Sequence, residues 1–291
     1  MNKLNRRKFL GQASMGLGSA LLLSQLPLNS FGQASAYAGK HTLGFQTFPI
    51  RDALSKDFPG TLKLMADMGY QTVEMCSPSG YAGIGFGKFA TMKGGEIKKV
   101  INDAGLSCPS CHFTFPELQN KLDDRIDFAQ QLGLNYMICS TFWLPKTATI
   151  KTYQESADTM NKIAEKISKA GMQAGFHNHD FEFASIDGVL IYDALMAEFD
   201  PKLVKMQFQT EVINLGYKAA DYFKKYPGRF ISAHMSDWTP EKKEVPIGKG
   251  VIDWKEFYAA AEIGGVKTFL VEMNMDTFKD SAAYIKGLKE A

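Results

Sequence analysis

One local pattern recurs along this sequence: a helical segment ends at a glycine, and a short apolar segment follows within a few residues. The five junctions are Ala66-Asp67-Met68-Gly69-Tyr70, Asn102-Asp103-Ala104-Gly105-Leu106, Gln130-Gln131-Leu132-Gly133-Leu134, Ser168-Lys169-Ala170-Gly171-Met172 and Ala261-Glu262-Ile263-Gly264-Gly265. Glycine adopts the left-handed conformation that closes a helix at little cost, so each junction is expected to be a helix C-cap followed by a tight loop. A chain divided in this way is expected to alternate helices and strands.

The segments between these junctions have the spacing of short strands and amphipathic helices. Eight strands are expected near residues 42–47, 71–75, 107–112, 135–140, 173–178, 204–210, 230–234 and 268–272. Apolar residues repeat with helical spacing from Ile150 to Ile167 and from Leu118 to Leu132. Strands that alternate with helices form parallel βαβ units, and eight such units can close into a barrel with no free edge.

The predicted fold class is therefore α/β, a single-domain (β/α)8 TIM barrel that spans residues 39–291. An open doubly wound sheet is the main alternative. Such a sheet usually has a glycine-rich phosphate turn after its first strand, and Gly44-Phe45-Gln46-Thr47 is not one. The sequence contains no recognisable linker, low-complexity run or second domain.

Residues 1–38 have the features of a Tat signal peptide and a short linker. The run Asn5-Arg6-Arg7-Lys8-Phe9-Leu10 precedes an apolar stretch that ends near Leu23, and small residues offer cleavage sites after Ala34 and Ala38. The apolar stretch is too short to span a bilayer comfortably, and no cysteine lies near it to carry a lipid. We therefore expect the Tat machinery to export the folded protein to the periplasm without a membrane anchor.

Charge and cysteine content narrow the function classes. The net charge is +2, and removal of the basic signal lowers it further, so nucleic acid is not expected as a partner. The same balance argues against an abasic-site endonuclease, a function that also uses this barrel. Cys108 and Cys111 have C-x-x-C spacing, but they lie in a predicted strand, where no helix N-terminus stabilises a thiolate. Cys108 and Cys111 are expected to be buried structural thiols.

Histidines and carboxylates gather where a TIM barrel has its active site, at the C-terminal ends of the strands. A single histidine is more often structural than functional. Of the five histidines, however, four lie at these strand ends: His112, His177, His179 and His234. The carboxylates in corresponding positions are Glu74, Glu182, Glu211, Asp237 and Glu272. Acidic residues favour helix N-termini in any case, but Glu272 ends an apolar strand, where a carboxylate is costly unless it is paired or binds a metal.

The alternation of side chains along each strand narrows this set. His177 and His179 share one face of the fifth strand, and Gln207, Gln209 and Glu211 share the inward face of the sixth. Inward polar side chains need partners, and a metal ion with a polyhydroxyl ligand would supply them. Imidazole and carboxylate ligands suit Mn, Co, Zn or Fe, without distinguishing among these four.

Several segments resemble the sugar phosphate isomerase/epimerase family, the xylose isomerase-like TIM barrels, over roughly residues 42–290. The segments that carry the resemblance are Gly44-Phe45-Gln46-Thr47-Phe48-Pro49-Ile50-Arg51-Asp52, Gly175-Phe176-His177-Asn178-His179-Asp180-Phe181-Glu182-Phe183, Tyr226-Pro227-Gly228-Arg229-Phe230, His234-Met235-Ser236-Asp237 and Val271-Glu272. The resemblance implies a divalent metal held by His177, a sixth-strand residue, His234 and Glu272. Relatives often have Glu in place of His177 and usually Asp in place of Gln209, so either Gln209 or Glu211 would be the sixth-strand ligand. Lys249 also stands where relatives commonly have Glu.

The implied activity is that of a metal-dependent sugar isomerase or epimerase acting on a ketose or keto-sugar through an enediolate. Glu272 is the leading candidate for proton transfer, followed by His179 and Glu182. The residues expected to line the substrate pocket are His112, Trp143, Glu74 and Gln46. A 3-keto-glycoside lyase or hydratase at the same site is one alternative, and a non-catalytic sugar-binding barrel is another. The sequence leaves the sugar, the metal and the formation of a homo-oligomer open.

Overall fold

Eight parallel strands form a closed barrel in the computed structural model, which describes residues 41–290. In order around the barrel they are β1 (Leu43–Gln46), β2 (Thr72–Cys76), β3 (Ser107–Phe113), β4 (Tyr136–Cys139), β5 (Gln173–His177), β8 (Val204–Gln209), β9 (Phe230–Met235) and β12 (Thr268–Val271). Pairing of β1 with β12 closes the ring. The predicted single-domain TIM barrel is confirmed, whereas the predicted signal peptide of residues 1–38 lies outside the described residues.

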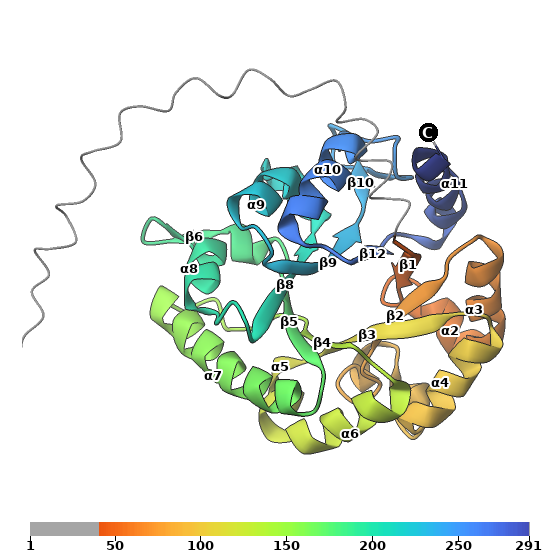
Figure 1. The fold of residues 1–291 in the computed structure, drawn as a ribbon, viewed down its shortest axis with the longest axis horizontal. Helices are drawn as coiled ribbons and strands as arrows, with labels where there is room; N and C mark the ends of the chain where they lie inside the picture. The colour runs from red at the N-terminus through yellow and green to blue at the C-terminus, as the bar shows by residue number, and fades with distance from the viewer. Residues whose placement is uncertain (1–40, 291) are drawn as a thin grey trace, which may run out of the picture.

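Helices surround the barrel and cover its outer face (Figure 1). They are α2 (Arg51–Lys56), α3 (Phe58–Asp67), α4 (Gly94–Asp103), α5 (Phe115–Asn120), α6 (Leu122–Leu132), α7 (Ile150–Lys169), α8 (Ile191–Glu198), α9 (Ala219–Lys225), α10 (Trp254–Gly264) and α11 (Phe278–Glu290). The stripe from Leu118 to Leu132 is divided between α5 and α6, because Lys121 leaves the helical conformation. Among the described residues, no helix has the length and apolar character needed to cross a membrane.

The glycine junctions behave as the sequence predicts. The φ angles of Gly69, Gly105, Gly133, Gly171 and Gly265 are all positive, between 82° and 99°. Gly265, rather than Gly264, is the left-handed residue of the last junction, since Gly264 still belongs to α10. Each short loop returns the chain to the N-terminal end of the next strand, so that all barrel strands run in one direction.

The outer faces of the strands form the hydrophobic core with the helices. On β5, for example, Phe176 is fully buried and its ring lies 5.1 Å from that of Phe199. All four cysteines are buried and free, and Cys108 and Cys111 are thus buried thiols as predicted. Burial raises the pKa of every one of these thiols, so they stay protonated at neutral pH.

The inner faces of the strands are polar toward the C-terminal end of the barrel. The buried side chains of this kind are Gln46, Glu74, Ser110, His112, His177, Gln207, Ser232 and His234. Beyond the strand ends lie η2 (Ala82–Ile84), η3 (Gly87–Phe89), η4 (Phe181–Phe183), η5 (Thr210–Leu215) and η6 (Met275–Thr277), with the ribbons β6 (Ser185–Ile186)–β7 (Val189–Leu190) and β10 (Asp237–Trp238)–β11 (Glu244–Val245). Buried polar groups require partners, so a functional site is expected at this end of the barrel.

Candidate metal centre

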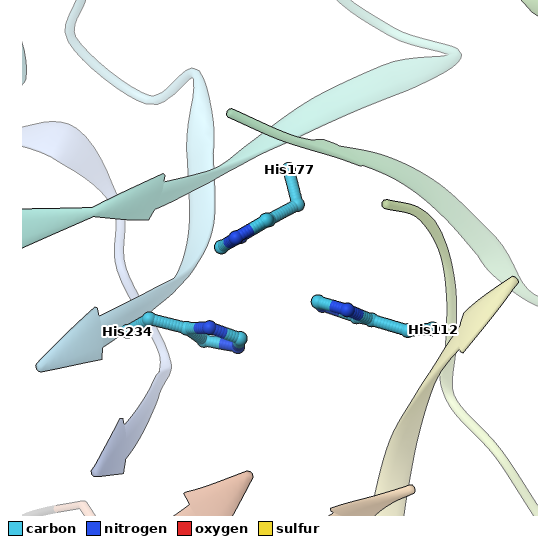
Figure 2. Close-up of side chains that lie close together, drawn as sticks. All are labelled: His112, His177 and His234. Atoms are coloured by element: carbon cyan, nitrogen blue, oxygen red, sulfur yellow. The ribbon is translucent and has the colours of Figure 1, made fainter. Parts of the chain in front are cut away.

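Three histidine side chains from separate strands meet inside the barrel near the C-terminal ends of the strands (Figure 2). His112 lies on β3, His177 ends β5 and His234 lies on β9. Their exposed fractions are 5, 1 and 0%. One ring nitrogen of each lies within 4.8 Å of those of the other two. The sequence predicted His177 and His234 as metal ligands and His112 as a substrate-binding residue, and the structure brings all three into one cluster.

Glu272 joins this cluster from the last strand of the barrel. It directly follows β12, and its Oε2 lies 2.8 Å from Nδ1 of His234. The side-chain amide of Gln209, at the end of β8, donates to the same oxygen at 2.6 Å. The ring centroids of His177 and His234 are 4.4 Å apart, so residues from β5, β8, β9 and β12 share one centre. The Glu272 side chain is 16% exposed, which makes it reachable from the barrel mouth.

Glu74 approaches the cluster from β2 and is completely buried. Its Oε1 lies 2.6 Å from Nε2 of His234 and 3.1 Å from Nε2 of His112. Gln46 donates to the same oxygen from its Nε2 at 3.0 Å, and Gln207 donates to Oε2 at 2.9 Å. Both residues that the sequence placed in the substrate pocket on β1 and β2, Gln46 and Glu74, are therefore bonded to other side chains in the interior.

The positive charge of His234 and the negative charges of Glu272 and Glu74 determine the protonation of all three groups. Burial alone would lower the pKa of His234, but the charges of Glu272 and Glu74 and their hydrogen bonds raise this pKa to about 9. Burial opposes ionisation of Glu272, but the charge and hydrogen bond of His234 lower the pKa of this carboxyl. Burial also opposes ionisation of Glu74, but the charges and hydrogen bonds of His112 and His234 lower the pKa of this carboxyl well below the ordinary value. Both carboxylates are ionised at neutral pH.

Two ring nitrogens at the site have no hydrogen-bond partner among the described residues. Nδ1 of His177 and Nδ1 of His179 are buried and unpaired. Burial, with the neighbouring His234 and His112, lowers the pKa of His177 well below its ordinary value. Burial also lowers the pKa of His179, to about 4. Both rings are neutral at pH 7 and hold lone pairs that a cation or a substrate hydroxyl could use.

An aromatic group flanks the centre at the barrel mouth. His179 follows the end of β5, and its ring lies parallel to that of Phe181 with the centroids 5.4 Å apart. The Trp143 ring centroid lies 5.6 Å from that of His179. Trp143 is 60% exposed, so one large ring presents a free surface to the solvent beside the candidate centre.

The remaining predicted carboxylates lie in different surroundings. Glu182, in η4, is fully buried and accepts hydrogen bonds from the Thr141 hydroxyl at 2.5 Å and the His179 amide at 2.7 Å. Burial raises the pKa of Glu182 to about 8. Glu211 is an exposed residue in η5, and its partial burial, followed by the charges of Glu272, Asp180 and Glu244, raises its pKa. The sixth-strand side chain that reaches Glu272 is Gln209, not Glu211.

Asp237 supports the mouth instead of lining the centre. Its buried carboxylate accepts hydrogen bonds from the amides of Gly248 at 2.8 Å and Gly250 at 3.1 Å, and from the Trp254 indole at 2.9 Å. These bonds hold the Gly248-Lys249-Gly250 turn in place. Lys249, which departs from the residue common in relatives, is exposed.

Comparison with known proteins places this geometry in a family. Residues 62–290 match the family described as xylose isomerase-like TIM barrel, which covers most of the chain. The chain belongs to this family. A comparison with curated protein sequences finds no match.

Several solved structures share the fold. A sugar phosphate isomerase/epimerase from Parabacteroides distasonis has a TM-score of 0.73 and 22% sequence identity, with 84% of this chain and 93% of that chain covered. L-ribulose 3-epimerase has a TM-score of 0.62 and 14% identity, covering 86% and 95%. A probable 3-DHS dehydratase from Bacillus anthracis has a TM-score of 0.64 and 12% identity, covering 84% and 98%. At these identities the likeness concerns the fold.

The donor set at the mouth of this xylose isomerase-like barrel fits a divalent cation. Nδ1 of His177 is buried and has no hydrogen-bond partner among the described residues, and Nδ1 of His234 faces the ionised Glu272. These three residues would hold the ion, with His112 close by and the Gln209 amide oxygen as a further donor. A cation would replace the proton on His234 Nδ1, so binding should release a proton. Nitrogen and oxygen ligands of this kind suit Mn, Co, Zn or Fe.

Sequence reasoning overlooked two residues that support the site. Asn178 Oδ1 accepts the backbone amide of Gln209 at 3.2 Å and so ties β5 to β8. Thr141 orients the Glu182 carboxyl. Strand alternation assigned Asn178 to the face opposite its two neighbouring histidines, and Thr141 lies in a loop without a local pattern. Only the positive φ of Thr141, 128°, distinguishes it, and that is visible in the structure alone.

Proposed function

We propose that the protein is a metal-dependent sugar isomerase or epimerase that acts on a ketose or keto-sugar through an enediolate. The observation that carries the proposal is the convergence of His177, His234 and Glu272 on one centre at the C-terminal end of the barrel. A divalent ion bound there would supply Lewis acidity to neighbouring oxygens of the sugar. Solved structures of sugar epimerases with the same fold support this choice.

In the proposed reaction, Glu272 removes the proton from the carbon beside the carbonyl. Its carboxylate is ionised at neutral pH and partly exposed to the mouth, so it can reach the substrate and accept a proton. The side-chain amide of Gln209 holds this carboxylate in place through a hydrogen bond to its Oε2. Return of the proton to the other face of that carbon gives epimerisation, and return to the neighbouring carbon gives isomerisation.

His179 and Glu182 have complementary protonation states. At pH 7 the His179 ring is neutral and can accept a proton, whereas Glu182 retains its proton. Of these two residues, we therefore assign the direct role in proton transfer to His179. The Glu182 carboxyl is fully buried and bonded to Thr141 and to the His179 backbone, so we propose that it positions the segment that carries His179.

Hydrogen exchange tests the proposal with a panel of free ketoses, because proton abstraction beside the carbonyl is common to all of them. The purified protein, supplied with Mn²⁺ or Co²⁺ in D2O, is incubated with each ketose and analysed by NMR. We expect deuterium to enter at the carbon beside the carbonyl, with the epimer or aldose accumulating. Glu272→Gln should lower the exchange rate by about 10²-fold or more, whereas exchange in the control Glu241→Gln, at an exposed position, should be unchanged. Equal exchange rates in Glu272→Gln and wild type would contradict the assignment.

A 3-keto-glycoside lyase or hydratase is the second candidate. The exposed ring of Trp143 beside the centre favours it, because such a ring could pack against the aglycone of a glycoside. The proposed export to the periplasm also suits the breakdown of extracellular glycans. Here the same proton abstraction would be followed by loss of the β-oxygen. Release of the aglycone and an enone absorbance from a 3-keto-glucoside would identify this reaction, and ketose epimerisation without release would exclude it.

A further inference from the structure

The buried carboxylate of Glu74 is bonded in a way that sets the orientation of its neighbours. Four side chains lie within hydrogen-bond distance of it, namely Gln46, His112, Gln207 and His234. The residue has an exposed fraction of 0%. A sugar hydroxyl in the mouth would have to displace one of these partners to reach it. The role of Glu74 therefore lies in the side chains that it holds.

Glu74 fixes the direction of the Gln207 amide. The amide nitrogen of Gln207 lies 2.9 Å from Glu74 Oε2 and 2.9 Å from Ser232 Oγ. If the amide were turned over, its oxygen would face the ionised carboxylate, and two acceptors would repel each other. The amide oxygen of Gln207 must consequently point toward His112, where it lies 2.6 Å from Nε2.

The fixed amide in turn fixes the proton of His112. A carbonyl oxygen can only accept a hydrogen bond, so Nε2 of His112 has to donate one. Glu74 Oε1, 3.1 Å from the same nitrogen, demands the same arrangement. The lone pair of a neutral His112 ring is then on Nδ1. His112 is thereby restricted to one tautomer by a carboxylate on the neighbouring strand.

Glu74 has the same effect on His234, without an intermediary. Its Oε1 lies 2.6 Å from Nε2 of His234, which requires a proton on that nitrogen. The other ring nitrogen, Nδ1, is the one that faces Glu272. One carboxylate therefore directs the rings of His112 and His234, two of the three rings drawn in Figure 2.

We propose that Glu74 is a positioning residue of the metal centre: it keeps the Nε2 protons of His112 and His234 in place and leaves Nδ1 of His234 for the ion. The inference rests on the proposed metal-dependent function. Carboxylates that accept the second N–H of a ligating histidine commonly raise metal affinity by fixing the tautomer and the ring orientation. Here one such carboxylate serves two histidines, and it assigns Nδ1 rather than Nε2 as the ligand atom.

Nitrogen NMR on protein labelled with ¹⁵N only in histidine tests this assignment directly. The chain has five histidines, so single variants can identify each signal. In the metal-free wild type we expect Nε2 of His112 and His234 to carry protons, and addition of Zn²⁺ should shift Nδ1 of His234. A Zn²⁺-induced shift at Nε2 of these rings would overturn the proposal. The ion would then bind the nitrogens that face Glu74, and Glu74 would be a metal ligand itself instead of a positioning residue.

Glu74→Gln provides the second test. An amide nitrogen in place of Oε1 would face the Nε2 protons of His112 and His234. An amide nitrogen in place of Oε2 would face Nε2 of Gln207 and turn that amide over, which would bring its N–H group against Nε2 of His112. In either case a histidine must give up its Nε2 proton or turn. We expect a changed tautomer signal and a Kd for Co²⁺ that is about 10- to 100-fold higher. Glu117→Gln is the matched control, since Glu117 is a buried carboxyl bonded to Ser77 and Thr114; its Kd should stay within about threefold of wild type.

The two possible failures can be distinguished. If the wild type shows the expected Nε2 protons but binds neither Zn²⁺ nor Co²⁺, the proposed function fails while the role of Glu74 in fixing the tautomers stands. If the wild type binds metal and Glu74→Gln, folded by circular dichroism, retains the wild-type Kd and tautomers, the inference is wrong and the proposed function stands. The metal-free wild-type spectrum decides the tautomer of His112, and the Zn²⁺-induced shift decides the ligand nitrogen of His234, even if Glu74→Gln does not fold.

Discussion

At the scale of single residues, burial and pairing give carboxyls on the same barrel opposite protonation states. Glu272 contacts His234 and is ionised. Glu182 accepts hydrogen bonds from neutral donors, among them the Thr141 hydroxyl and the His179 amide, and burial raises its pKa to about 8. The difference arises because a neighbouring histidine offsets the cost of burying charge, whereas neutral donors offset it only in part.

This difference predicts how the Glu182 carboxyl affects stability. The unfolded carboxyl ionises near 4.5, but the folded one retains its proton up to about pH 8. Its contribution is therefore most favourable below pH 4.5 and is lost as the pH rises from 4.5 to 8, by up to about 5 kcal/mol. Glu182→Gln, which resembles the protonated form, should lack this loss.

Urea unfolding between pH 5 and 9 measures the effect. The free energy of unfolding of Glu182→Gln should increase relative to wild type as the pH rises and level off above pH 8. The control Glu241→Gln, at an exposed position, should keep the wild-type profile. A constant difference between Glu182→Gln and wild type at every pH would mean that the carboxyl ionises normally in the folded protein.

Position along the strands sufficed to predict which residues gather, but not how they bond. His177, His234 and Glu272 follow from the rule that strand ends meet at one mouth, and the structure brings them together. The bond between Glu74 and His234 joins β2 to β9, across the barrel. Such partners depend on side-chain lengths and barrel width, which no local pattern encodes. Glu211 was expected to face inward because alternation was extended past Gln209, where the strand ends and η5 begins.

At the scale of elements, tight helix packing constrains the composition of α4. Its first two residues are Gly94 and Gly95, a pair that helix propensity alone would disfavour. A Cβ atom at Gly94 would lie 2.5 Å from the carbonyl oxygen of Phe128 in α6, whereas at Gly95 nothing lies within 4 Å. Gly94 thus allows α4 to approach the α6 backbone, and Gly95 has no such role.

The two glycines form a matched pair for mutation. Gly94→Ala should destabilise the protein by about 1–3 kcal/mol, because neighbouring backbone cannot move aside as a side chain would. Gly95→Ala should leave stability unchanged or raise it by about 0.5 kcal/mol through helix propensity. Chemical denaturation of both variants compares them, and equal effects at the two positions would contradict the packing explanation.

Element boundaries show where sequence periodicity stops being informative. The glycine junctions predicted helix ends well, since a positive φ has few other causes and all five glycines named in the fold have one. The stripe from Leu118 to Leu132 kept helical spacing across the break at Lys121. Leu118 in α5 and Leu122, Ala129 and Leu132 in α6 are all buried, so the pattern of burial does not reveal the interruption.

At the scale of the whole molecule, the proposed metal ion would link strands that are far apart in sequence. His177 ends β5, His234 lies on β9 and Glu272 directly follows β12. Closure of the barrel between β1 and β12 brings the three residues to one mouth. An ion that binds these residues binds only the closed barrel, because in the unfolded chain they are separated by long segments. Metal binding should therefore stabilise the entire fold, and not one loop.

Thermal unfolding tests this coupling independently of any substrate. At a metal concentration about 100-fold above Kd, binding should add roughly 2.7 kcal/mol, which for a domain of this size raises Tm by about 5–10 °C; EDTA should reverse the rise. His234→Ala should abolish the metal-dependent part of Tm. His41→Ala is the matched control, because His41 lies before β1, away from the cluster, and it should retain the full rise. An equal metal-dependent rise of Tm in His234→Ala and wild type would mean that the ion binds elsewhere, and the assignment of the metal centre to the barrel mouth would be wrong.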